Sequence, residues 1–156
     1  MKKALFLDRD GVINVEKNWV YRIEDFEFTE GIFDLCKKYS ENGYLIIVIT
    51  NQAGIAKGFY TESDFLKLTE WMNNQFLKKG ILITKVYYCP HHPDFTGKCT
   101  CRKPEPGMIL QATKEFSLDI SECVLIGDKE SDLEAGRNAG IPEFNLHFYN
   151  QSNEEE

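Results

Sequence analysis

The chain has 156 residues, of which 42% are apolar and 28% charged, so it can form one compact domain with an ordinary globular core. The formal net charge of −7 argues against a general nucleic-acid binder, because such proteins usually present a basic face. The longest apolar run, residues 44–49, is much shorter than the roughly 20 residues that cross a bilayer, and Lys2 and Lys3 precede too few apolar residues for a signal peptide. We therefore expect a cytoplasmic protein without a membrane or nucleic-acid partner.

Short apolar runs alternate with helical patterns along the chain. Residues 3–8, 44–49 and 122–126 have the composition of buried strands in a parallel sheet, and 85–88 and 143–148 are further strand candidates. Helices are expected over 32–39, over 65–76 after an N-cap at Thr61, over 106–116 with Pro106 in the first position, and over 131–139 before Gly140.

This alternation predicts an α/β fold with a doubly wound parallel sheet. We expect a single domain over residues 1–150, and a disordered tail over 151–156 because that segment is polar and ends in three glutamates. No insertion before residue 103 is long enough for a separate cap domain.

Polar residues follow the predicted strands at their carboxyl ends, where open α/β sheets bind ligands. Asp8 and Asp10 follow the first strand, Thr50 the second and Asp128 a later one, while Lys103 precedes the helix at Pro106. Each has an ordinary structural explanation on its own: a turn, a strand end or a solvated lysine. Their occurrence together, in this order and at these edges, favours one catalytic site. Asp132 either supports that site from behind or is solvated.

Phosphoryl transfer would account for this set of residues. Asp8 would attack phosphorus and Asp10 would exchange protons with the leaving alcohol and with water. Thr50 and Lys103 would stabilise the phosphoryl oxygens. Mg²⁺ would be held by Asp8, Asp10 and Asp128, because carboxylates are suitable hard ligands for it. The sequence therefore predicts a magnesium-dependent phosphatase.

Three of the five cysteines lie within 13 residues of one another, which in a reducing compartment suggests a metal site rather than disulfides. The predicted ligands form a loop over residues 89–101: Cys89, His91, Cys99 and Cys101, with His92 as a substitute for His91. Four protein ligands leave no open position, so this Zn²⁺ would be structural. Cys36 and Cys123 lie in apolar patterns and are expected in the core.

The motifs around these residues resemble those of haloacid-dehalogenase-type phosphatases. The matching segments are 6–14 (FLDRDGVIN), 48–52 (VITNQ), Lys103 and 127–132 (GDKESD). The Cys-X-His and Cys-X-Cys loop narrows the resemblance to the branch that contains heptose bisphosphate and histidinol-phosphate phosphatases. Segments 50–58, 68–72, 87–93 and 101–108 are more similar to the heptose enzymes, and the similarity covers residues 4–142.

The resemblance implies a Rossmann-like fold without a cap and a small phosphorylated sugar as substrate. It implies hydrolysis of the 7-phosphate of a heptose 1,7-bisphosphate through an aspartyl-phosphate, for nucleotide-activated heptose in lipopolysaccharide, capsule or surface-layer glycans. We expect a monomer. The residues that the resemblance assigns to substrate binding are Arg9, Glu16, Trp19, Asn51, Gln52, Ala53, Arg102 and Lys129.

Two other functions remain open. Only seven residues separate His91 from Cys99, a spacing closer to the histidinol-phosphate branch, so histidinol-phosphate phosphatase activity in histidine biosynthesis is the alternative. A non-catalytic interaction module stabilised by zinc is the third candidate, and the complete set of acids with Lys103 argues against it.

Overall fold

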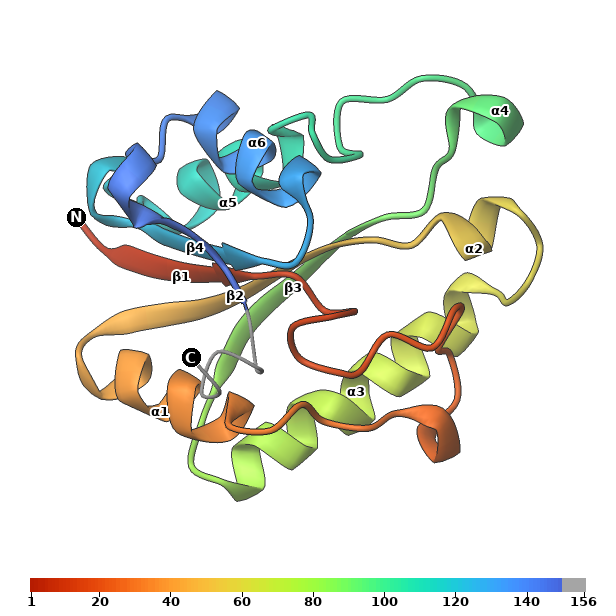
Figure 1. Cartoon of the computed structure of the whole chain (residues 1–156), viewed down its shortest axis with the longest axis horizontal. Helices are drawn as coiled ribbons and strands as arrows, with labels where there is room; N and C mark the ends of the chain where they lie inside the picture. The colour runs from red at the N-terminus through yellow and green to blue at the C-terminus, as the bar shows by residue number, and fades with distance from the viewer. Residues whose placement is uncertain (150–156) are drawn as a thin grey trace.

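The computed structural model describes residues 1–149 and shows a five-stranded parallel sheet with helices on both faces (Figure 1). The predicted tail over 151–156 lies outside the described residues. The strands are β1 (Lys3–Leu7), β2 (Tyr44–Asn51), β3 (Ile83–Cys89), β4 (Val124–Gly127) and β5 (Leu146–Phe148). The α-helices are α1 (Ile32–Glu41), α2 (Ala53–Ala56), α3 (Glu62–Lys78), α4 (Pro93–Thr96), α5 (Gly107–Phe116) and α6 (Glu130–Ala139). Short 3₁₀ helices are η1 (Ile23–Asp25), η2 (Ile120–Glu122) and η3 (Glu143–Asn145).

The strand order is β3-β2-β1-β4-β5, and every pair is parallel. The chain moves outward from β1 through β2 to β3 and then returns to the other side of β1 with β4. The sheet therefore reverses its order between β1 and β4, and ligands of doubly wound folds bind beyond the strand ends at such a point. This observation confirms the predicted fold class.

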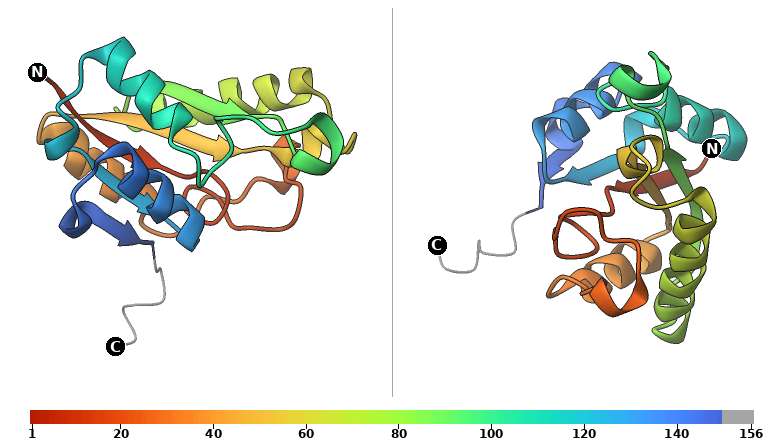
Figure 2. Two further views of the ribbon diagram at one scale, coloured as in Figure 1. Left: turned by 90° about the horizontal axis from the view of Figure 1, so that it is seen from above. Right: turned by 90° about the vertical axis from the view of Figure 1, so that its right-hand side faces the viewer.

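Two helix pairs cover the two faces of the sheet (Figure 2). On one face, α1 and α3 pack Ile32, Met72 and Phe76 against alternate residues of the central strands such as Leu5 and Val48. The alternation follows from the pleat of a strand, which points successive side chains to opposite faces. Cys36 is buried in this layer, as predicted.

On the other face, α5 and α6 pack Ile109, Ala112 and Leu133 against the intervening strand residues such as Phe6 and Ile47. Cys123 is buried in this second layer, which again confirms the prediction. Both faces of β1 are thus covered, and this explains why its sequence is an unbroken apolar run.

The predicted element boundaries needed small corrections. Pro106 caps α5 rather than occupying its first turn, and the strand expected over 122–126 starts only at Val124 because residues 120–122 form η2. The strand expected over 143–148 is shortened by η3. Among residues 1–149, no helix has both the length and the apolar character that crossing a bilayer requires.

Candidate active site

A cavity of about 570 Å³ lies at the carboxyl edge of the sheet, and its volume is typical of small-molecule sites. The loops and short helices that follow β1, β2 and β4 contribute to its lining, together with the segment before α5. Most residues predicted for the site line this cavity: Asp8, Asp10, Glu16, Trp19, Asn51, Gln52, Ala53, Arg102, Lys103 and Lys129. The strand-end rule therefore located the cavity correctly.

Lys103 is the buried cation at the base of the cavity. Its Nζ lies 3.0 Å from Asp8 Oδ1 and 2.5 Å from Asp132 Oδ1, and it donates a hydrogen bond of 3.0 Å to the main-chain carbonyl of Ile49. Lys103 is only 5% exposed, so these carboxylates replace the water that would otherwise solvate the ammonium group. The loop before α5 thus delivers one positive charge to the end of β1.

Asp132 is 2% exposed and supports the site rather than facing solvent. Its Oδ2 accepts hydrogen bonds from the main-chain N–H groups of Asp128 and Lys129, at 3.0 and 3.1 Å. These N–H groups lie immediately before α6, whose N-terminal dipole also favours a carboxylate. The start of α6 therefore fixes the carboxylate that holds Lys103.

The charges of Asp8, Lys103 and Asp132 shift one another's pKa values. Burial raises the pKa of the Asp8 carboxyl well above its usual value, and the positive charge of Lys103 opposes that effect. Burial alone would lower the pKa of Lys103, but Asp8 and Asp132 outweigh it and raise that pKa. For Asp132, Lys103 and the helix N–H groups overcome the effect of burial, so its pKa is lowered.

The carboxylates around Lys103 have the chemistry of a divalent-cation site. Asp8, Asp128 and Asp132 each offer an oxygen within 4.8 Å of the other two, and Asp128 Oδ1 is buried without a hydrogen-bond partner. Three carboxylates exceed the single charge of Lys103, and oxygen ligands of this kind suit Mg²⁺. Gly11, at φ +91°, permits this approach, since a Cβ there would lie 2.0 Å from Asp128 Oδ2. The residues present therefore fit Mg²⁺.

The Asp10 carboxylate lies outside this group of three, because other side chains already hold it. Asp10 Oδ1 accepts hydrogen bonds from Arg9 Nη2 at 2.8 Å and Asn14 Nδ2 at 3.0 Å, and Oδ2 accepts one from Gln52 Nε2 at 3.1 Å. Asp10 as a magnesium ligand therefore stays a prediction, which the position of its carboxylate does not support.

Arg9 is buried, with 1% exposure, and does not line the cavity. Its Nη2 also donates to the carbonyl of Val20 at 2.7 Å, and its guanidinium lies 5.7 Å from the ring centre of Phe26. The Arg9 side chain thus holds the Asp10 carboxylate and the loop that contains Val20. Direct contact with substrate stays a prediction without support from this geometry.

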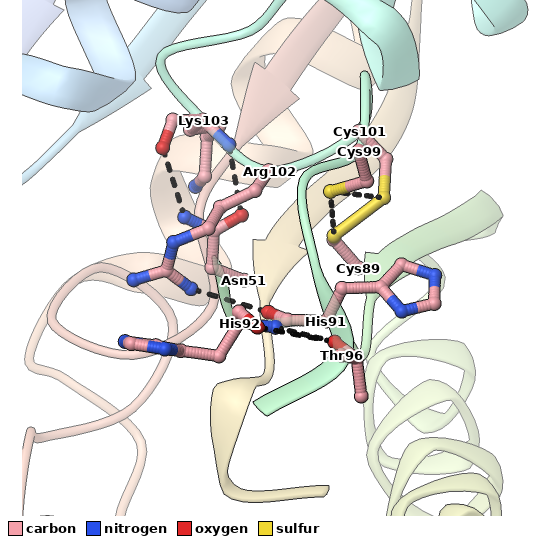
Figure 3. Close-up of a disulfide and its surroundings, with 9 residues drawn as sticks. All are labelled: Asn51, Cys89, His91, His92, Thr96, Cys99, Cys101, Arg102 and Lys103. Carbon is pink, nitrogen blue, oxygen red and sulfur yellow. Dashed lines mark hydrogen bonds between the residues drawn. A yellow bond between two sulfur atoms is a disulfide. The ribbon is translucent and has the colours of Figure 1, made fainter. Parts of the chain in front are cut away.

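Asn51 and Thr50 at the end of β2 have different environments. The Asn51 side chain makes two hydrogen bonds to the main chain of Lys103. Its Oδ1 accepts from the Lys103 N–H at 3.0 Å, and its Nδ2 donates to the Lys103 carbonyl at 3.3 Å (Figure 3). Thr50 is fully buried, and its hydroxyl accepts a hydrogen bond of 2.9 Å from Gln52. Asn51 therefore sets the position of the Lys103 main chain as well as lining the cavity.

Some cavity residues were absent from the sequence prediction. These are Val20, Lys57, Tyr60, Pro104 and Ser131, whereas Asp132 was predicted either to support the site or to be solvated. Lys57 and Tyr60 follow β2 by six and nine residues, beyond the reach of a rule based on strand ends. Lys57 Nζ lies 5.0 Å from the ring centre of Trp19, so the tertiary structure brings a cation and an aromatic face together at the cavity wall.

The three cysteines of the loop lie close together next to Arg102 and Lys103 (Figure 3), two residues that line the cavity. The sulfurs of Cys89, Cys99 and Cys101 lie within 4.8 Å of one another, and the Cys99 sulfur is 3.5 Å from Cys89 and 3.6 Å from Cys101. Cys89 and Cys101 are joined as a disulfide, whereas the sequence favoured metal binding. Among the described residues, the group of potential ligands within 4.8 Å of one another contains these three cysteines and not His91. His91 as the fourth metal ligand therefore stays a prediction.

Comparison with known proteins agrees with this geometry. A family model described as HAD-hydrolase-like matches residues 100–144. The D-glycero-alpha-D-manno-heptose-1,7-bisphosphate 7-phosphatase of Campylobacter jejuni is 54% identical over 139 residues, covering 89% of this chain and 78% of that protein. The D-glycero-beta-D-manno-heptose-1,7-bisphosphate 7-phosphatase of Yersinia pestis is 44% identical over 143 residues, covering 88% and 76%.

A solved structure also matches over nearly the whole chain. The D,D-heptose 1,7-bisphosphate phosphatase of B. bronchiseptica, complexed with magnesium and phosphate, has a TM-score of 0.81 and 25% identity, covering 94% of this chain and 92% of that one. The chain therefore belongs to the haloacid-dehalogenase-type phosphatases, in the family of the D-glycero-D-manno-heptose-1,7-bisphosphate 7-phosphatases.

Proposed function

We propose that the chain is an Mg²⁺-dependent phosphatase that removes the 7-phosphate of D-glycero-α-D-manno-heptose 1,7-bisphosphate through an aspartyl-phosphate on Asp8. The observation that carries the reaction is the position of Lys103, which holds Asp8 at the base of the cavity at 3.0 Å. The substrate is argued from the relatives. The α anomer is favoured because identity to the α-named relative is 54%, against 44% for the β-named one.

Asp8 supplies the nucleophilic oxygen. An oxygen of its carboxylate bonds to phosphorus as the bond between phosphorus and the C7 oxygen breaks. Asp10 gives a proton to the departing sugar oxygen, so the products of this half-reaction are the sugar alcohol and the aspartyl-phosphate. Asp10 then takes a proton from water, whose oxygen attacks phosphorus and releases inorganic phosphate and the Asp8 carboxylate.

Charge stabilisation falls to the groups around phosphorus. Lys103 offsets negative charge on the phosphoryl oxygens and Asp132 holds that ammonium in place, while Thr50 is the hydroxyl that the sequence assigns to the same oxygens. Mg²⁺, held by Asp8 and Asp128, would lower the repulsion between the nucleophilic carboxylate and the dianionic phosphate.

The wall of the cavity would select the sugar. Arg102 and Lys129 offer positive charges for the phosphate that is kept, and Glu16 and Trp19 offer a carboxylate and an aromatic face for the heptose. The product would feed nucleotide-activated heptose for surface glycans. The proposal includes action in the cytoplasm by a monomer.

We also propose that Zn²⁺ binds Cys89, Cys99 and Cys101 with His91 as the fourth ligand. The distances of 3.5 and 3.6 Å from the Cys99 sulfur to the other two support it. Thiolates on one tetrahedral zinc ion lie about 3.8 Å apart, given a Zn–S bond of about 2.3 Å. A disulfide beside a free thiol is the alternative state of the same three sulfurs. Metal content and free-thiol titration of reduced protein separate the two states.

The test measures phosphate release with Mg²⁺ from both anomers of the heptose bisphosphate and from histidinol phosphate, beside an Asp8→Asn variant. We expect Asp8-dependent release with preference for the α anomer. Preference for histidinol phosphate would move the protein to histidine biosynthesis. No Asp8-dependent release from any phosphate ester would favour the non-catalytic zinc module.

A further inference from the structure

A chain of buried hydrogen bonds runs from Tyr60 to Asp10. The Tyr60 hydroxyl donates to Gln52 Oε1, and Gln52 Nε2 donates to Asp10 Oδ2 at 3.1 Å and to Thr50 Oγ1 at 2.9 Å. Tyr60 is 6% exposed and Gln52 2% exposed, so water does not replace these bonds easily. Both side chains nevertheless border the cavity in which Asp10 would meet the substrate.

The direction of this chain is fixed by chemistry. An ionised Asp10 can only accept hydrogen bonds, so the amide nitrogen of Gln52 must face it and the amide oxygen must face Tyr60. Tyr60 must then donate. Burial raises the pKa of Tyr60 to about 12, which keeps the proton on its hydroxyl over the working range of pH.

The two oxygens of Asp10 have unequal surroundings. Oδ1 faces Arg9 Nη2 at 2.8 Å, Arg9 Nε at 3.3 Å and Asn14 Nδ2 at 3.0 Å, so N–H groups crowd it. Oδ2 faces Gln52 Nε2. A proton on Oδ1 would point at these donors, whereas Oδ2 keeps a lone pair for exchange with a ligand in the cavity.

Packing fixes the Tyr60 ring that starts this chain. It stacks on Tyr21 with ring centres 5.1 Å apart and planes 9° apart. On another side it presses against Gly54 of α2, where a Cβ would lie 2.3 Å from the Tyr60 ring. The hydroxyl is therefore aimed at Gln52 by a ring with little room to move.

We propose that Tyr60 and Gln52 are positioning residues that make Asp10 Oδ2 the oxygen that exchanges a proton with the leaving alcohol. Tyr60 holds the Gln52 amide in one orientation, and that amide holds the Asp10 carboxylate with Oδ2 toward the cavity. The inference rests on the proposed function, in which Asp10 is the general acid.

A Tyr60→Phe variant tests this with two phosphate esters that differ in their leaving groups. The heptose bisphosphate releases an alcohol, which needs a proton as it departs, whereas p-nitrophenyl phosphate releases a phenolate that leaves without one. The ratio kcat/KM covers the steps up to departure of that group, so it reports on the acid. We expect kcat/KM for the heptose to fall about tenfold or more, since general acid catalysis contributes about 10²–10⁴-fold, and kcat/KM for the nitrophenyl ester to change by less than about threefold.

Tyr21→Phe is the matched control, because it removes a hydroxyl from the stacked neighbour and leaves Gln52 untouched. Gln52→Met gives the same readout if Tyr60→Phe does not fold, as judged by thermal unfolding. The two substitutions act through one chain, so the double variant is expected to lose no more than Gln52→Met alone.

Equal losses on both esters in Tyr60→Phe would overturn the inference and leave the proposed function standing. Independent, multiplicative losses in the double variant would also overturn it. Wild-type protein that releases no phosphate from the heptose in an Asp8-dependent way would overturn the proposed function itself, and with it this role for Tyr60.

Discussion

Asp132 shows how a side chain that follows a strand end by several residues becomes part of the site. From the sequence alone, Asp132 could equally have been exposed to solvent. Only the folded structure shows that its Oδ1 lies 2.5 Å from Lys103 Nζ. Arg9 shows the opposite case, since its position beside Asp8 suggested substrate contact but its guanidinium is buried against Asp10 and Val20. Successive side chains at a strand end point in opposite directions. A residue next to Asp8 in the sequence therefore need not point into the cavity.

We expect Asp132→Asn to lower both stability and turnover. The substitution removes a buried negative charge that Lys103 and two main-chain N–H groups contact, and breaking a buried pair costs about 3–5 kcal/mol. Denaturant unfolding measures the first effect, and kcat for phosphate release measures the second. Glu134→Gln, on an exposed position of the same helix, is the control. An Asp132→Asn variant that matches this control in both measurements would contradict the assigned role.

At the scale of elements, the caps explain which boundaries could be predicted. Thr61 caps α3 as expected: its hydroxyl accepts from the Asp64 N–H, and the Asp64 carboxylate accepts from the Thr61 N–H, both at 3.0 Å. This reciprocal pair depends on residues within one turn, so the sequence contains all of it. The strands over 122–126 and 143–148 were shortened because 3₁₀ turns precede β4 and β5, and apolar patterns do not distinguish such turns from strand residues.

The cap predicts a pH dependence of stability. The Thr61 N–H holds the pKa of Asp64 below its usual value of 3.8, so this carboxylate stabilises the fold when ionised. That contribution is present above the unfolded-state pKa and is lost as the pH falls through the lower folded-state pKa. We expect Asp64→Asn to lower the thermal midpoint at pH 7 and to match wild type once the pH is below both values. A difference in thermal midpoint between Asp64→Asn and wild type that persists unchanged at low pH would contradict this role. Glu70→Gln, on the same helix, is the control.

The cysteine loop predicts an effect of metal removal on stability. A closed zinc site mainly supplies folding free energy, so we expect zinc-free, reduced protein to have a lower thermal midpoint and to keep every reacting group. Cys101 precedes Arg102 and Lys103, so loosening of the loop should also lower turnover in part. Thermal unfolding with parallel metal analysis measures this. Protein that contains no zinc when freshly purified under reducing conditions, and is equally stable with and without added zinc, would refute the zinc site.

At the scale of the whole molecule, the reversal of strand order brings Asp8, which follows β1, beside Asp128, which follows β4, and Asp132 in the first turn of α6. The three acids lie within 4.8 Å of one another with Lys103 as the buried cation. Adding Mg²⁺ should therefore raise the thermal midpoint, because a ligand that binds only the folded state at ten times its Kd stabilises it by about 1.4 kcal/mol. NaCl at matched ionic strength should have no such effect, and Asp128→Asn should weaken the response. An unchanged response in that variant would contradict the assignment.

The sequence by itself determined the fold class, the order along the chain of the five strands and of helices α1, α3, α5 and α6, and the strand ends that carry Asp8, Thr50 and Asp128. These features follow from local periodicity, caps and motif spacing, which are properties of short segments. Only the tertiary structure decided that Asp132 holds Lys103, that Arg9 faces inward, and that Tyr60 reaches Gln52. Those contacts join segments that are distant in sequence or depend on the direction of a side chain, and packing against other elements sets both.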